Sequence, residues 1–129
     1  MKRHNPHPVL PAYAAVFAHG VEVPAAARQL YVSGQVGIGA DGRTVAGGFA
    51  GQCRQAIANL EAVLAAAGMA LADIVKVTIY ITRREDIPTL RAVREEQLAV
   101  APAVTMVIVA GLHAPDWLVE IEAVAASAS

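Results

Sequence analysis

The segment DIVKVTIYIT, Asp73–Thr82, alternates between two kinds of side chain with a period of two residues. Successive side chains of a β-strand point to opposite faces of a sheet, so this pattern predicts a strand with two different faces. One face carries only aliphatic residues: Val75, Val77, Ile79 and Ile81. The other face is mixed: Ile74, Lys76, Thr78, Tyr80 and Thr82. Such a strand is typical of a sheet that packs on helices from one side.

The sequence on either side of this strand predicts further strands and two helices. Segments rich in β-forming residues predict strands at residues 14–23, 29–36, 103–110 and 117–126. Apolar residues spaced three and four apart predict helices at residues 49–67 and 86–98. The order β-β-α-β-α-β-β, with helices long enough to cover one face of a sheet, predicts an α+β fold.

Length, charge and cysteine content narrow the class of protein. The 129 residues correspond to one domain, residues 1–129, and prolines at positions 6, 8 and 11 predict an irregular arm over residues 1–12. A formal net charge of −1 makes nucleic acid an unexpected partner. No apolar run is long enough to span a membrane. The single cysteine, Cys53, excludes an internal disulfide and favours a reducing, cytoplasmic location.

Four stretches together resemble one known family, the RidA/YjgF family of reactive imine and enamine deaminases, also called endoribonuclease L-PSP. They are YVSGQV (31–36), ANLEAVLAAAG (58–68), DIVKVTIYIT (73–82), and PAVT (102–105) with VEIEAVA (119–125). The resemblance runs from about Tyr13 to the C-terminus. It implies a chorismate-mutase-like fold with a mixed sheet, a homotrimer, and small-molecule clefts between subunits. It also implies hydrolysis of an imine or enamine acid without a metal or cofactor.

The resemblance assigns roles to individual residues of this sequence. Glu120 is expected to place the catalytic water. The substrate-binding cleft is expected to contain Tyr13, Ser33, Gly34, Gln35, Val104 and, by gapless counting along the second helix, Leu90. The family carries at position 104 an arginine that grips the substrate carboxylate, and this chain carries valine there.

Valine at position 104 removes the carboxylate anchor, because arginine donates two parallel charge-assisted hydrogen bonds and valine donates none. The loss of about 1.5 to 3 kcal/mol, and more where the substrate charge is desolvated without a partner, corresponds to roughly tenfold to several-hundredfold weaker binding. A less acidic or bulkier ligand is therefore expected. Arg91 or Arg94 could instead replace the missing arginine, although their spacing with Glu95 and Glu96 is typical of a solvated helix face.

Several functions remain open at this point. The first is a cofactor-free hydrolase acting on a C–N bond, and the second is a ligand-binding or interaction module without catalysis. The third, an endoribonuclease, has little support from the charge and the few aromatic residues. No two histidines stand three or four apart on a predicted helix, so no metal site is expected. Cys53 lies on an apolar helical stripe and is expected to be a core residue.

Overall fold

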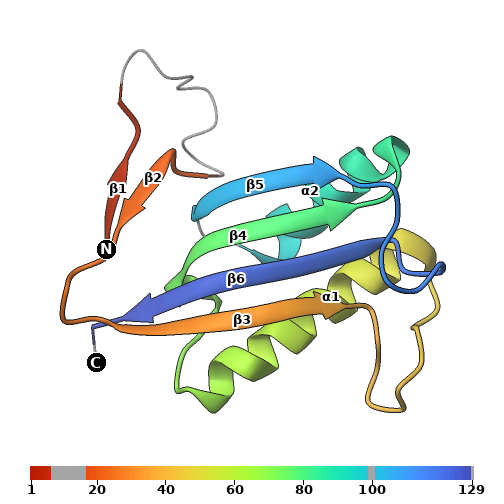
Figure 1. Ribbon diagram of the computed structural model, residues 1–129, viewed down its shortest axis with the longest axis horizontal. Coiled ribbons are helices and arrows are strands. Elements are labelled where there is room, and N and C mark those ends of the chain that lie inside the picture. The colour runs from red at the N-terminus through yellow and green to blue at the C-terminus, as the bar shows by residue number, and fades with distance from the viewer. Residues whose placement is uncertain (7–16, 99–100, 129) are drawn as a thin grey trace.

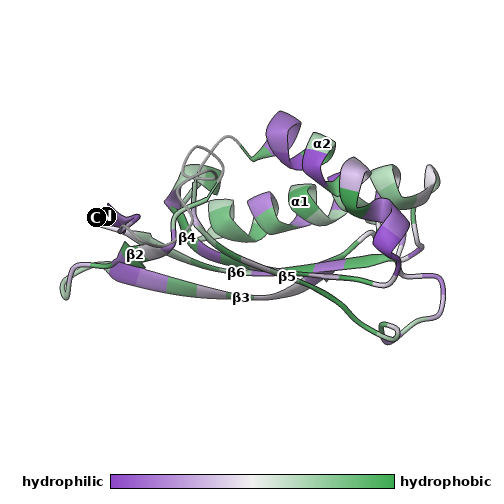
Figure 2. Ribbon diagram, turned by 90° about the horizontal axis from the view of Figure 1, so that it is seen from above, coloured by the Kyte–Doolittle hydropathy of each residue, from purple (hydrophilic) through white to green (hydrophobic). Residues whose placement is uncertain are grey.

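A four-stranded sheet with two helices on one face forms the body of the protein (Figures 1 and 2) in the computed structural model, which describes residues 1–6, 17–98 and 101–128. The strands are β3 (Arg28–Val36), β4 (Ile74–Ile81), β5 (Ala103–Ile108) and β6 (Val119–Ser127). Their order across the sheet is β3-β6-β4-β5. β4 and β5 run parallel, whereas β6 is antiparallel to both β3 and β4. The predicted α+β fold and mixed sheet are confirmed.

The helices α1 (Gly48–Ala66) and α2 (Ile87–Gln97) bury their apolar residues against this sheet (Figure 2). The predicted stripe of α1 is confirmed in its buried members, Cys53, Ile57, Leu60 and Leu64. Gly68 follows the helix with a φ of 71°, a left-handed conformation that glycine adopts at little cost. Short 3₁₀ helices, η1 (Leu71–Asp73) and η2 (Arg84–Asp86), precede β4 and α2. No helix of the described residues is long and apolar enough to cross a membrane.

The alternation of β4 orients the sheet. Val77, Ile79 and Ile81 belong to the buried core beneath the helices, as predicted. At the start of the strand the prediction was wrong, because Ile74 joins the core cluster although it was assigned to the mixed face. The β4–β6 register shifts between Ile74 and Lys76, and this irregularity moves the first residue to the core side.

The N-terminal prediction needs a correction. Within the expected irregular arm, Lys2–His4 forms a strand, β1, that pairs antiparallel with β2 (Gly20–Glu22) in a separate two-stranded sheet. The prolines at positions 6, 8 and 11 lie beyond β1 and therefore leave its amide donors intact. Arg3 Nε also donates to the Ala101 carbonyl at 2.8 Å. The observed order is therefore β-β-β-α-β-α-β-β, with one strand more than predicted.

Candidate functional site

The face of the sheet opposite the helices is called the open face below (Figure 2). By the register of β3, β4 and β6, this face carries Tyr31, Lys76, Tyr80, Glu120 and Glu122. Tyr80 pairs with Glu120 in the β4–β6 register, so the two side chains leave the sheet on the same side. The Tyr80 hydroxyl donates a hydrogen bond to the Glu122 carboxylate. Lys76 Nζ donates to Thr105 Oγ1 at 2.7 Å. Polar and acidic groups thus gather on the open face.

A bulge in β3 brings Gly34 to Glu120. Val32 pairs with Ala123 and Gln35 with Ile121, so Ser33 and Gly34 together oppose one residue, Glu122. A Cβ added at Gly34 would overlap the Glu120 carboxylate and lie 2.7 Å from its Cδ. The Glu120 side chain therefore lies across the space that glycine leaves free. Bulges of this kind re-aim side chains and are common beside active sites.

The residues next to Gly34 lie on different sides of the sheet. Ser33 is exposed, and its carbonyl accepts a hydrogen bond of 3.1 Å from Gln35 Nε2. The structure therefore brings Gly34 to Glu120, and Ser33 is the bulge residue next to Gly34. Gln35 pairs with Ile121, so its Cβ leaves the strand on the core side, and the described contacts join it to Ser33 and not to Glu120. Tyr13 lies outside the described residues.

Tyr80 was not identified from the sequence as a site residue. Its pKa is raised, first because its hydroxyl donates to Glu122, then through desolvation, and then through the negative charges of Glu122 and Glu120. The alternation of β4 placed Tyr80 on the mixed face. Its carboxylate partner could be found only by knowing that β6 is the neighbouring strand.

Val104 does not meet Glu120 within one chain. Val104 pairs with Val77 in the parallel β4–β5 register and packs against the hydrophobic core on the side of the helices. Glu120 projects from the open face, where it contacts Gly34. β5 is an edge strand, so position 104 lies at the border of the sheet.

Leu90 is a correction to the predicted cleft. It is 2% exposed and belongs to the core, so it does not reach a surface cleft of the chain. The apolar periodicity of α2, which placed Leu90 on the inner face of the helix, was the better guide than gapless counting.

The two arginines proposed as substitutes lie on α2, on the opposite side of the sheet from Glu120. Arg91 is exposed. Arg94 is partly buried, and its Nε makes no hydrogen bond to any described residue. Burial lowers the Arg94 pKa, because it penalises the charged form. Neither arginine is placed to serve Glu120 in the same chain.

Cys53 is a core residue, as predicted. Its side chain is fully buried, and burial raises the pKa of the thiol to about 11. A thiol with so little thiolate at neutral pH is a poor nucleophile. In the part of the chain that the structure describes, no three His, Cys, Asp or Glu residues form a group that could hold a metal ion.

The sequence is similar to that of known proteins over most of its length. The family described as endoribonuclease L-PSP matches residues 9–127. The 2-iminobutanoate/2-iminopropanoate deaminase of Escherichia coli K12 is 34% identical over 119 residues, which cover 89% of this chain and 90% of that protein. A RutC family protein of Pyrococcus horikoshii is 33% identical over 97 residues, or 74% of this chain and 77% of that protein.

Solved structures share the fold. The Rid family protein YyfB of Yersinia pestis, described as of unknown function, has a TM-score of 0.83 at 32% identity and covers 96% of both chains. Escherichia coli TdcF, solved with bound serine, has a TM-score of 0.70 at 31% identity, covering 86% of this chain and 87% of that one. The RidA-type α+β fold implied by the sequence resemblance is confirmed.

Proposed function

The chain belongs to the endoribonuclease L-PSP family, which includes the RidA-like imine deaminases, and we propose that it hydrolyses an imine, enamine or related C=N bond at clefts between the subunits of a homotrimer. The observation that carries the proposal is the Glu120 carboxylate lying across Gly34 at the bulge of β3. The deaminase name of the relative at 34% identity supports the same reaction class.

Glu120 is the carboxylate proposed to act as the general base for the attacking water. Glu122 accepts a hydrogen bond from Tyr80, whereas Glu120 makes none to any described residue. In the proposed reaction, water attacks the imine carbon while Glu120 accepts a proton from that water. The proton then passes to the substrate nitrogen, which gives a carbinolamine. Glu120 next moves the hydroxyl proton of the carbinolamine to the same nitrogen, the C–N bond breaks, and ammonia leaves a carbonyl product. No metal or cofactor is required for this sequence.

The positions of Val104 and Glu120 support a cleft made by two subunits. They lie on opposite sides of the sheet, so a cleft that contains both needs a second copy of the chain. Tyr31, 73% exposed, stands on the open face, and Val107 on the edge strand is also exposed. Large exposed apolar and aromatic groups of this kind favour coverage by another subunit. The homotrimer is the assembly implied by the resemblance to RidA.

Because position 104 is a valine, the proposed ligand is less acidic or bulkier than a 2-imino acid. A valine provides hydrophobic contact but no hydrogen-bond donor for a carboxylate. Replacing arginine by valine therefore weakens the binding of substrates with a carboxylate more than that of substrates without one. Hydrolysis of 2-imino acids should therefore be slow compared with that of an uncharged imine of similar size.

The test is the steady-state hydrolysis of 2-iminobutanoate and of an uncharged imine by the unmodified protein and by Glu120→Gln. Loss of the general base should lower kcat/KM at least about 100-fold. Glu61→Gln, an exposed change on α1, is the matched control and should leave kcat/KM unchanged. Saturable binding without turnover in the unmodified protein would establish instead a ligand-binding module. RNA cleavage that persists through repurification and disappears in Glu120→Gln would establish an endoribonuclease.

A further inference from the structure

A pocket of about 580 Å³ lies at the carboxyl ends of the two parallel strands. Its walls are residues 82–83 after β4 and 110–113 after β5, together with Pro115 and Leu118. The volume is within the range of small-molecule sites.

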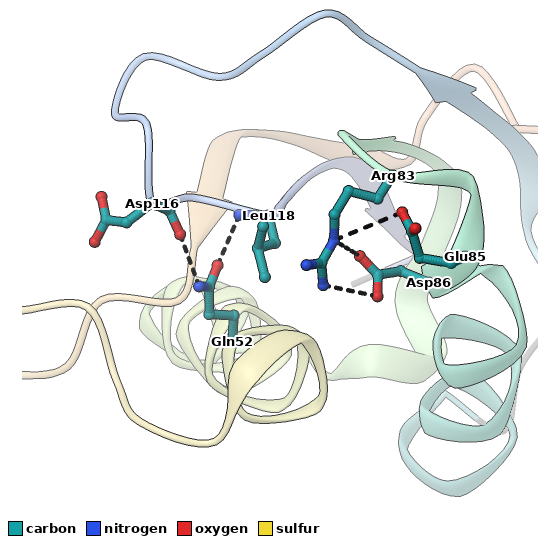
Figure 3. A network of polar contacts seen from close by, with 6 residues as sticks. All are labelled: Gln52, Arg83, Glu85, Asp86, Asp116 and Leu118. Atoms are coloured by element: carbon teal, nitrogen blue, oxygen red, sulfur yellow. Dashed lines mark hydrogen bonds and ion pairs between the residues drawn. The ribbon is translucent and has the colours of Figure 1, made fainter.

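Arg83 belongs to the lining of this pocket. Its guanidinium faces two carboxylates (Figure 3), those of Asp86 and of Glu85, whose Oε1 lies 3.9 Å from Arg83 Nε. Its Nε and Nη2 donate to the two carboxylate oxygens of Asp86 at 2.8 and 3.0 Å. Asp86 is only 7% exposed, so this bidentate pair fixes the plane of the guanidinium. The remaining nitrogen, Nη1, points away from Asp86 toward the side of Leu118, and it makes no hydrogen bond to a described residue.

Gln52 fixes the opposite wall. Its Nε2 donates to the Asp116 carbonyl at 2.9 Å, and its Oε1 accepts from the Leu118 N–H at 2.8 Å (Figure 3). Among the described residues, the buried polar or charged side chains are those of Gln52 and Asp86. Both hold a wall of this pocket in place. Burying a polar group costs free energy unless its hydrogen bonds are made. The bonds of Gln52 and Asp86 therefore favour one conformation of the segments that they join.

The lining of the pocket combines the charged Arg83 with apolar residues. Backbone N–H groups of residues 110–113 make no hydrogen bond to another described residue, and Nη1 adds two more donors. Leu112, Pro115 and Leu118 supply aliphatic contact. A ligand that accepts hydrogen bonds through a negative group and carries a short apolar tail complements this lining. We propose that the pocket binds a small aliphatic carboxylate, with Arg83 as its anchor.

This site is separate from the one around Glu120. In Figure 3 the Arg83 guanidinium lies between Gln52 of α1 and Asp86 at the start of α2. Glu120 projects from the open face of the sheet. The proposal therefore does not rest on the proposed hydrolysis, and the two can fail independently.

The experiment is a titration of the full chain with 2-oxobutanoate, followed through the backbone amide signals of Gly111 and Leu112 in two-dimensional NMR spectra. A Kd on the order of 1 mM is expected for so small a ligand. Butanamide, which lacks the charge, should cause no shift in these signals. Gly34→Ala should bind 2-oxobutanoate as the unmodified protein does.

Two variants test the pocket itself. Arg83→Lys keeps a positive charge beside Asp86 but loses the planar fork, and it should raise the Kd about tenfold. Gly111→Val adds a side chain to the pocket lining without a backbone clash, since a Cβ there meets nothing within 4 Å, and it should raise the Kd at least as much. Arg84→Gln, an exposed neighbour outside the lining, should leave the Kd unchanged.

The following results would contradict the proposed site. Absence of shifts at Gly111 and Leu112 up to about 50 mM 2-oxobutanoate, far above the expected Kd, would mean that Arg83 only holds the start of α2. Equal binding of butanamide, or an unchanged Kd in both folded variants, would also overturn the proposal.

Discussion

Gly34→Ala should remove most of the hydrolytic activity while leaving the protein folded. The new methyl group would overlap the Glu120 carboxylate and lie 2.7 Å from its Cδ and 3.0 Å from its Cγ. These atoms end a side chain that can rotate away, at a cost of about 0.5–1.5 kcal/mol for a strained rotamer. Replacing glycine in a conformation that alanine tolerates returns about 0.4–1 kcal/mol. Gly34 does not have positive φ, so the net change in unfolding free energy should be within about 1 kcal/mol.

Gly37→Ala is the matched control, because the same methyl group meets backbone there. Its Cβ would lie 2.6 Å from both Cα and Cβ of Gln52 on α1. The helix cannot rotate aside, so overpacking should cost about 1–3 kcal/mol or more. Urea denaturation gives the unfolding free energy of each variant, and kcat/KM for an uncharged imine gives its activity.

The two variants should therefore separate stability from activity. Gly34→Ala is expected to be nearly as stable as the unmodified protein and to lose most of its kcat/KM, because Glu120 no longer points as it did. Full activity in Gly34→Ala would refute the role of the bulge in placing Glu120. A stability loss as large as that of Gly37→Ala would refute the claim that only a mobile side chain is displaced.

Three further changes test other parts of the structure. Gln52→Leu leaves the Leu118 N–H and the Asp116 carbonyl without their partner. It should lower the free energy of unfolding, measured by urea denaturation, by about 2–4 kcal/mol. The raised Cys53 pKa contributes stability that is present below the unfolded value of 9.0 and is lost as pH rises toward about 11. Over that pH range the free energy of unfolding of the unmodified protein should thus fall by about 2–3 kcal/mol relative to that of Cys53→Ala. Parallel curves of unfolding free energy against pH for the two proteins would contradict this. Glu122→Gln should lower the Tyr80 pKa toward its ordinary value in an ultraviolet titration; an unchanged titration would refute the Tyr80–Glu122 bond.

Local patterns predicted the body of the fold correctly. The period-two alternation of β4 and the three- and four-residue spacing of α1 reflect burial on one side of the sheet, and the structure follows both. The strand β1 could not be predicted, because its stability depends on pairing with residues about 20 positions away and on a contact to Ala101. Short polar segments carry no periodic signal of their own.

The site was predictable only in part. Family resemblance brought Gly34 and Glu120 together, but the bulge that joins them depends on the β3–β6 register, which no local pattern specifies. Arg83 was missed because its importance comes from a buried partner, Asp86, and from a loop some 30 residues further along the chain. Leu90 was misplaced because counting along a helix from a relative ignored its apolar face.

The most direct test of the account is the kcat/KM for 2-iminobutanoate in the unmodified protein and in Val104→Arg. The account holds that Glu120 still places water while the carboxylate anchor is absent. It predicts that Val104→Arg raises kcat/KM by roughly tenfold to about 150-fold, the effect of restoring a charge-assisted contact of about 1.5 to 3 kcal/mol. Turnover of 2-iminobutanoate by the unmodified protein as fast as by a folded Val104→Arg variant would contradict it.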